Sequence, residues 1–158
     1  MIERKLTGRA LTPDEISLCR SVFGQAIDYG QVTIFNRKWW LFQNPRVTMA
    51  PDGNLWFHPR GNLFCDDFCG SARNIQALFI HEMVHVWQHQ QGVFLPLARH
   101  PFSRYDYELK AGKAFAQYGI EQQAEIVSHY FLLKTGARLT NGYGLADYHG
   151  LLPFQDII

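Results

Sequence analysis

The stretch from Ile80 to Gln91 reads IHEMVHVWQHQQ and contains an HExxH pattern formed by His81, Glu82 and His85. On a helix, residues four positions apart lie on the same face, one above the other. Two imidazoles at this spacing can bind one metal ion, and the glutamate between them can accept a proton. The stretch therefore predicts a metal site on a helix. The rest of the chain must supply the remaining metal ligand and the residues that support the site.

The surrounding sequence predicts a long helix over residues 72–91 that ends at Gly92. Its apolar residues surround almost the whole circumference, as is typical of a buried helix. They are Ile75, Leu78, Phe79, Ile80, Met83, Val84, Val86 and Trp87. Polar side chains buried in such a helix need partners, because burial without a partner costs free energy. A bound metal ion would give His81, Glu82 and His85 that partner.

A catalytic zinc needs a third protein ligand and keeps its fourth position for water. The HExxHxxGxxH pattern takes its third ligand from the same helix, but Gln88 and Gln91 stand here where that pattern has glycine and histidine. His89 follows His81 by eight residues, or about 12 Å of helix, so the two cannot share one ion. We interpret His89 as a polar residue near the helix end.

A second helix is predicted over residues 115–134, ending at Gly136, with Ile120, Ala124, Val127 and Phe131 as its buried stripe. Glu121 and Glu125 share one face of it. Glu121 can bind the metal, and Glu125 can accept a hydrogen bond from the other ring nitrogen of one histidine. The small Ala124 would let the two helices approach closely. An exposed acidic pair is the alternative; the upstream HExxH favours the metal site.

The N-terminal part predicts one helix and a small sheet. Residues 12–15 (Thr-Pro-Asp-Glu) form a capping box, and an apolar stripe of Ile16, Cys19, Val22 and Phe23 leads to a stop at Gly24. Residues 31–35 predict a strand, and residues 46–50 and 55–58 flank a Pro-Asp-Gly-Asn turn. Residues 39–42 (Trp-Trp-Leu-Phe) are interpreted as packing and not as an aromatic binding surface.

Residues 59–72 and 93–112 are predicted loops, and no repeat or domain boundary is evident. We predict one α+β domain over residues 1–158, with a core over about 12–135 and a surface-packed tail over 137–158. The tail could alternatively dock a partner or close the cleft as a self-inhibitory segment.

The composition excludes several classes of protein. The chain has 158 residues, 47% of them apolar and 18% charged, with a net charge of +1. No basic block supports binding to nucleic acid or to an anionic membrane. No apolar run reaches the ~20 residues that span a bilayer, and the charged N-terminal stretch is not a secretory signal peptide. Three cysteines indicate reduced thiols in a cytosolic setting; Cys65 and Cys69 are interpreted as loop thiols and not as a second metal site.

HExxH followed by ExxAE resembles the gluzincin class of zinc peptidases in its smallest, single-domain form. Phe23-Gly24, the QVTIF and LWF strands and HEMVHVWQHQQG also resemble, in this order, the small zincin domains of bacterial toxin and secretion loci. The chain most resembles the Vgr-related zinc metallopeptidases of type VI secretion, over residues 12 to about 135. The family helix commonly reads HExxHxxQQ, and His89 interrupts these glutamines here.

The resemblance implies a zincin-like (minigluzincin) fold, a Zn2+ cofactor held by His81, His85 and Glu121, and a peptide or protein substrate. It also implies a VgrG-like secretion partner and export that needs no signal peptide. Glu82 would act as the general base. The candidates that could stabilise the oxyanion are Tyr105, Tyr107, Tyr118 and His129, and the strand over residues 55–58 would bind the substrate as an edge strand. The alternative function is a catalytically silent binding module for a secretion component.

Overall fold

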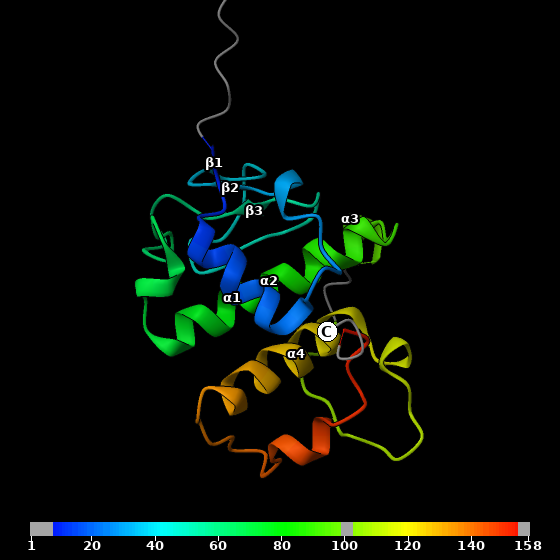
Figure 1. The fold of residues 1–158 in the computed structure, drawn as a ribbon. Helices are drawn as coiled ribbons and strands as arrows, with labels where there is room; N and C mark the ends of the chain where they lie inside the picture. The colour runs from blue at the N-terminus through cyan, green and yellow to red at the C-terminus, as the bar shows by residue number, and fades with distance from the viewer. Residues whose placement is uncertain (1–7, 99–102, 155–158) are drawn as a thin grey trace, which may run out of the picture.

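The computed structural model describes residues 8–98 and 103–154. These residues form a small α+β domain with helix α2 (Arg73–Gln90) in its middle. Helix α1 (Pro13–Phe23) and a three-stranded sheet lie on one side of α2, and helix α4 (Ile120–Lys134) lies on the other side (Figure 1). The predicted α+β architecture with a small mixed sheet is confirmed. Short helical segments complete the fold: η1 (Tyr29–Gln31), η2 (Phe68–Gly70), α3 (Leu95–Ala98), η3 (Phe115–Gln117) and η4 (Leu145–Tyr148).

Helix α1 begins with the predicted capping box. The backbone N–H of Glu15 donates to the Thr12 hydroxyl, and the Glu15 carboxylate accepts from the backbone N–H of Thr12. Gly24, with φ of 56°, ends the helix. The carboxylate of Glu15 is fully buried and also accepts hydrogen bonds from the Arg9 guanidinium and from the Phe68 backbone N–H. The capping residue therefore also ties α1 to the first strand and to η2.

The sheet has the order β1-β2-β3. Strand β2 (Thr33–Phe35) pairs antiparallel with β1 (Gly8–Ala10), and it pairs parallel with β3 (Leu55–Trp56). The sequence analysis predicted β2 and β3 but not β1. A three-residue strand containing Gly8 has too little alternation of polar and apolar residues to be recognised, and its pairing with β2 defines it.

The predicted hairpin around residues 51–54 is reduced to a single bridge between Met49 and Trp56. Strand β3 therefore has β2 on one side and Met49 on the other. Strand β3 is the last strand in the sheet order, in agreement with the edge strand predicted over residues 55–58. On its open side, the backbone of Trp56 is already bridged by Met49.

The interpretation of residues 39–42 as packing residues was wrong. Trp39 and Trp40 are 38% and 47% exposed, and Leu41 and Phe42 are 72% and 75% exposed. These residues lie on the connection between β2 and β3, outside the hydrophobic cluster that α1, α2 and α4 share.

Helix α4 begins five residues later than predicted. Residues 115–117 form the separate helix η3, and Tyr118 and Gly119 are extended. The side chain of Gln122 accepts a hydrogen bond from the backbone N–H of Gly119 and caps the new helix start. The C-terminal stop before Gly136, which has φ of 87°, agrees with the prediction.

The tail from residue 137 onward was predicted to pack on the surface, but part of it belongs to the hydrophobic core. Its residues Tyr148, Leu152 and Phe154 are buried, and the ring of Phe154 lies 5.0 Å from the rings of both Phe23 and Trp87. Helix η4 packs against α4 on the side opposite α2 (Figure 1). Residues 155–158 lie outside the described part. Among the helices of the described ranges, none combines the length and apolar character needed to cross a bilayer.

Candidate metal centre

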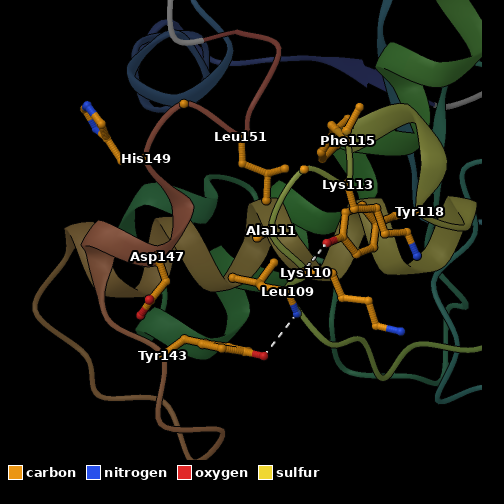
Figure 2. A pocket seen from close by; sticks show the side chains of 13 residues that line it. Leu109, Lys110, Ala111, Lys113, Phe115, Tyr118, Tyr143, Asp147, His149 and Leu151 are labelled. Atoms are coloured by element: carbon orange, nitrogen blue, oxygen red, sulfur yellow. Dashed lines mark hydrogen bonds between the residues drawn. The ribbon is translucent and has the colours of Figure 1, made fainter.

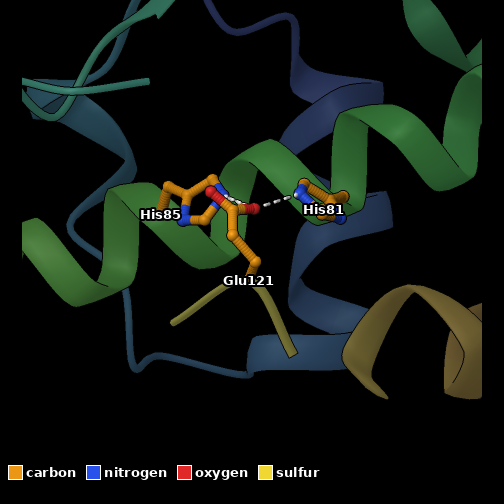
Figure 3. A group of neighbouring side chains, drawn as sticks. All are labelled: His81, His85 and Glu121. Atoms are coloured by element: carbon orange, nitrogen blue, oxygen red, sulfur yellow. Dashed lines mark hydrogen bonds and ion pairs between the residues drawn. The ribbon is translucent and has the colours of Figure 1, made fainter. Parts of the chain in front are cut away.

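Two helices bring three ligand-type side chains together. His81 and His85 lie on successive turns of α2 and face α4, with their ring centroids 5.1 Å apart. Glu121 lies in the first turn of α4. Its Oε2 lies 3.3 Å from Nε2 of His81 and 3.1 Å from Nε2 of His85 (Figure 3). The structure thus assembles the predicted triad, and all three side chains are buried.

The close approach of α2 and α4 has a local cause. Ala124 is fully buried, and its small side chain leaves room for the facing helix. One turn further on, the Ser128 hydroxyl donates to the backbone carbonyl of Ala77 at 2.9 Å. The first turn of a helix carries the positive end of its dipole, which favours the carboxylate of Glu121.

Glu125 fixes the orientation of the His81 ring. Its Oε1 lies 2.8 Å from Nδ1 of His81. Because a carboxylate can only accept, Nδ1 of His81 carries a proton, and Nε2 is the nitrogen that faces the centre and would bind a metal ion there. Glu125 therefore makes the contact with a ring nitrogen of a ligand histidine that the sequence analysis described.

Gln88 fixes the orientation of the His85 ring in a similar way. The sequence analysis did not predict this role for Gln88. Its amide nitrogen donates to the Ile120 carbonyl at 3.1 Å and to Oε1 of Gln123 at 2.9 Å. The amide oxygen is therefore the group that accepts from Nδ1 of His85, at 2.8 Å. Gln88 stands three residues after His85 and so shares its helix face, which was the available signal.

The three inward-facing atoms require a positive charge between them. If neither Nε2 carried a proton, two imidazole lone pairs and a carboxylate oxygen, all within 4.8 Å of one another, would repel each other in this buried site. Burial alone would lower the pKa of His81, but hydrogen bonds with Glu121 and Glu125 raise that pKa to about 10. A metal ion satisfies the same need, and two nitrogens and one oxygen suit a divalent transition metal. The donor set fits a metal ion.

Glu82 lies beside this centre. It is 3% exposed and lines a cavity of about 420 Å3 together with His81, Glu125 and Tyr105. The Arg46–Thr48 segment, which precedes the bridge at Met49, lines the same cavity. The cavity therefore brings together the carboxylate of Glu82, one histidine of the triad and the segment that leads to the sheet.

Two of the four oxyanion candidates, Tyr105 and His129, line this cavity. The Tyr105 ring is half exposed and stacks on the ring of His81 at 6.1 Å. Nε2 of His129 lies 3.4 Å from the other oxygen of Glu125. Tyr107 lies behind His129: its hydroxyl contacts Nδ1 of His129 at 2.7 Å and also bonds to the hydroxyl of Tyr148. A chain of polar contacts thus runs from His81 to the tail.

Tyr118 is not brought to the centre. It is 4% exposed, and its hydroxyl accepts a hydrogen bond from the Lys110 backbone N–H. It lines a different cavity of about 540 Å3, between the loop before α4 and the tail (Figure 2). This position leaves Tyr118 in the packing around α4.

Other polar candidates lie apart from the centre. His89 is exposed, and its ring lies against Gly53. Cys19, Cys65 and Cys69 are free thiols. Within residues 8–98 and 103–154, the triad is the group whose ligand atoms lie close enough to share a metal ion.

Fold and site together define a small α+β domain with a buried two-helix His-His-Glu centre. No family model matches the chain. The effector domain of Pseudomonas aeruginosa VgrG2b has a similar structure, with a TM-score of 0.78 and 38% sequence identity over 92% of this chain and 84% of that one. The chain belongs to the family of this effector domain.

The full-length relative is the type VI secretion system spike protein VgrG2b of Pseudomonas aeruginosa strain PAO1. The two sequences are 42% identical over 135 residues, which cover 80% of this chain and 13% of that protein. The chain therefore corresponds to a small part of the spike protein.

Proposed function

We propose that this chain is a zinc-dependent peptidase of the gluzincin type that acts as an effector of type VI secretion. The observation that carries the proposal is the position of Glu82, which is buried, lines a cavity and adjoins a triad of metal-ligand type. A structural metal site has no need of a further carboxylate beside an accessible cavity.

His81, His85 and Glu121 would hold the ion, and a donor set of two histidines and one glutamate is one that catalytic zinc sites use. When bound, zinc supplies a Lewis acid that lowers the pKa of a coordinated water to about 7. Glu82 accepts the proton of the attacking water and delivers it to the nitrogen of the departing amine. Glu125 and Gln88 hold the two imidazoles with their Nε2 atoms toward the centre.

The oxyanion that develops during attack on a carbonyl needs a hydrogen-bond donor. Tyr105 and His129 are the candidates with access to the cavity. We favour Tyr105, because its half-exposed ring stacks on the ring of His81, one of the proposed metal ligands.

The substrate is an extended peptide. Residues 46–48 line the cavity and lead into Met49, which bridges to β3, so a peptide strand added along this segment would pass the triad. This segment adjoins the open side of β3, the strand that the sequence analysis expected to bind the substrate.

The link to type VI secretion rests on the family. A relative that is a spike protein carries the matching effector domain. We propose a VgrG-like spike as the partner of this chain and delivery by that system as its route out of the cell.

The test combines metal content with hydrolysis. We expect one zinc per chain, hydrolysis of an unfolded protein such as casein, and a loss of turnover of about 10²–10⁴-fold in Glu82→Gln with zinc retained. Glu108→Gln makes the same change at an exposed position and should leave turnover unchanged. Stoichiometric zinc with equal, negligible turnover in the wild type and Glu82→Gln would instead support the silent binding module.

A further inference from the structure

The connection between β2 and β3 carries a set of exposed apolar side chains that the proposed peptidase site does not use. We refer to residues 37–47, Arg-Lys-Trp-Trp-Leu-Phe-Gln-Asn-Pro-Arg-Val, as the aromatic loop. It leaves the sheet after Phe35, and the chain rejoins the sheet at Met49. Phe35 and Met49 both neighbour Trp56, so the loop starts and ends at one place on the sheet.

The loop is held in a defined shape. Gln43 is 4% exposed, and its amide oxygen accepts a hydrogen bond from the Trp39 backbone N–H. Its amide nitrogen donates to the carbonyls of Val47 and Trp56. Lys38 donates to the carbonyl of Leu41 at 3.3 Å. A polar side chain inside the loop thus fixes the backbone, while the apolar side chains point outward.

Exposure rises along the loop from its base to its tip. Trp39 is 38% exposed and Trp40 47%, whereas Leu41 and Phe42 are 72% and 75% exposed. Large exposed apolar side chains in the other described segments, such as Phe94 and Leu145, stand singly in the sequence. Four consecutive ones are an exposed patch of the kind that marks an interaction site.

The charges of the loop are all of one sign. Arg37 and Lys38 precede the apolar tip and Arg46 follows it, and residues 36–51 contain no acidic side chain. The net charge of the whole chain is only +1, so this loop, with three basic residues and no acidic one, is more positive than the rest of the chain taken together. Such a surface is complementary to a partner that is apolar inside and anionic at its surface.

We propose that the aromatic loop docks the protein on an anionic lipid bilayer. The sequence has no basic block to predict this role, and the proposal rests instead on the exposed apolar side chains of residues 39–42 together with three nearby cations. Tryptophan favours the headgroup region, which matches the half-exposed Trp39 and Trp40, and the more exposed Leu41 and Phe42 would reach the acyl boundary. The flanking cations would meet anionic headgroups. A protein partner normally needs roughly 20–30 residues on each side of an interface, and the loop offers five apolar ones, counting Val47. Insertion into lipid needs no such area.

Docking would also fix the orientation of the cavity beside Glu82 relative to the membrane. Arg46 and Val47 belong both to the loop and to the lining of the cavity beside Glu82. A protein held by this loop would keep that cavity next to the lipid surface. The proposal does not depend on peptidase activity, because it uses none of the residues of the metal centre.

Vesicle co-sedimentation tests the proposal with the full chain. We expect binding to vesicles of phosphatidylcholine mixed with phosphatidylglycerol, weaker binding to phosphatidylcholine alone, and weaker binding at high salt. Leu41→Ser and Phe42→Ser should each weaken binding by roughly ten- to a hundredfold. Arg37→Gln combined with Lys38→Gln should weaken binding to the anionic vesicles severalfold.

Matched controls lie elsewhere on the surface. Leu145→Ser removes an exposed leucine from η4, and Arg138→Gln combined with Lys110→Gln removes two exposed charges; all should bind as the wild type does. Circular dichroism and thermal melting confirm that each variant is folded. Glu82→Gln should bind vesicles normally, which separates this proposal from the peptidase.

Three outcomes would overturn the proposal. They are no vesicle binding by the folded wild type, binding that the loop variants leave unchanged, and loop variants that abolish a concentration-dependent dimer in sedimentation velocity without changing vesicle binding. The last result would assign the loop to a second copy of the chain.

Discussion

Nδ1 of His85 lies 2.8 Å from the amide oxygen of Gln88, one helical turn further along α2. The amide nitrogen of Gln88 is held by Ile120 and Gln123 on the α4 side, so the orientation of the His85 ring depends on how the two helices meet.

This contact predicts that Gln88→Leu weakens metal binding. Loss of the group that orients a ligating histidine typically lowers metal affinity by about 10–100-fold. A competition titration against a chromophoric zinc chelator measures the effect. Gln91→Leu changes an exposed glutamine just after the helix and should leave the affinity unchanged. Equal affinities in the two variants would show that Gln88 does not support the ligand.

A second prediction concerns the tail. Phe154 is 1% exposed and packs edge-on against Phe23 and Trp87. Phe154→Ala should lower the free energy of unfolding by about 3–5 kcal/mol, because it opens a cavity between α1, α2 and the tail. Urea denaturation measures this loss. Leu145→Ala, at a position that is 47% exposed, should change the free energy by less than about 0.5 kcal/mol. Equal effects would mean that the tail is not part of the core.

A third prediction concerns the buried carboxylate of α1. Glu15 accepts hydrogen bonds from both terminal guanidinium nitrogens of Arg9, at 2.8 Å, and from two backbone N–H groups. Glu15→Ala removes the carboxylate that pairs with Arg9 and takes away the acceptor of the two N–H groups, so it should lower the free energy of unfolding by about 3–5 kcal/mol. Asp14→Ala, at the exposed neighbouring position, should cost less than about 1 kcal/mol. Comparable losses in the two variants, measured by chemical denaturation, would contradict the role given to Glu15.

A fourth prediction concerns the pH dependence of folding stability at Asp67. The backbone N–H of Cys69 donates a hydrogen bond to the Asp67 carboxylate and lowers the pKa of that carboxyl below its usual value of 3.8. Burial opposes this shift, and a hydrogen bond from the Thr12 hydroxyl lowers the pKa further. A lowered folded-state pKa gives stability that is present above the unfolded value and is lost as pH falls through the folded value. Asp67→Asn should therefore be less stable than the wild type at neutral pH.

This difference should shrink in acid, below the usual pKa of aspartate. Urea denaturation of both proteins across that range measures it. A difference in stability that stays constant with pH would assign the effect of Asp67 to its shape and not to its charge.

The sequence by itself predicted the parts that local rules control. The capping box at Thr12, the stop glycines and the buried character of α2 follow from propensity and periodicity within single segments. The spacing of four residues placed His81 and His85 on one face of α2, and Glu121 and Glu125 on one face of α4. These relationships hold within one helix and need no knowledge of its neighbours.

Only the tertiary structure decided what lies between segments. It paired β1 with β2 and placed Met49 against the open side of β3. It also turned Gln88 toward His85, kept Tyr118 away from the triad, brought Phe154 into the core and left Trp39–Phe42 exposed. Burial and hydrogen bonding of a side chain depend on which distant segment faces it, and that information is spread over the whole chain.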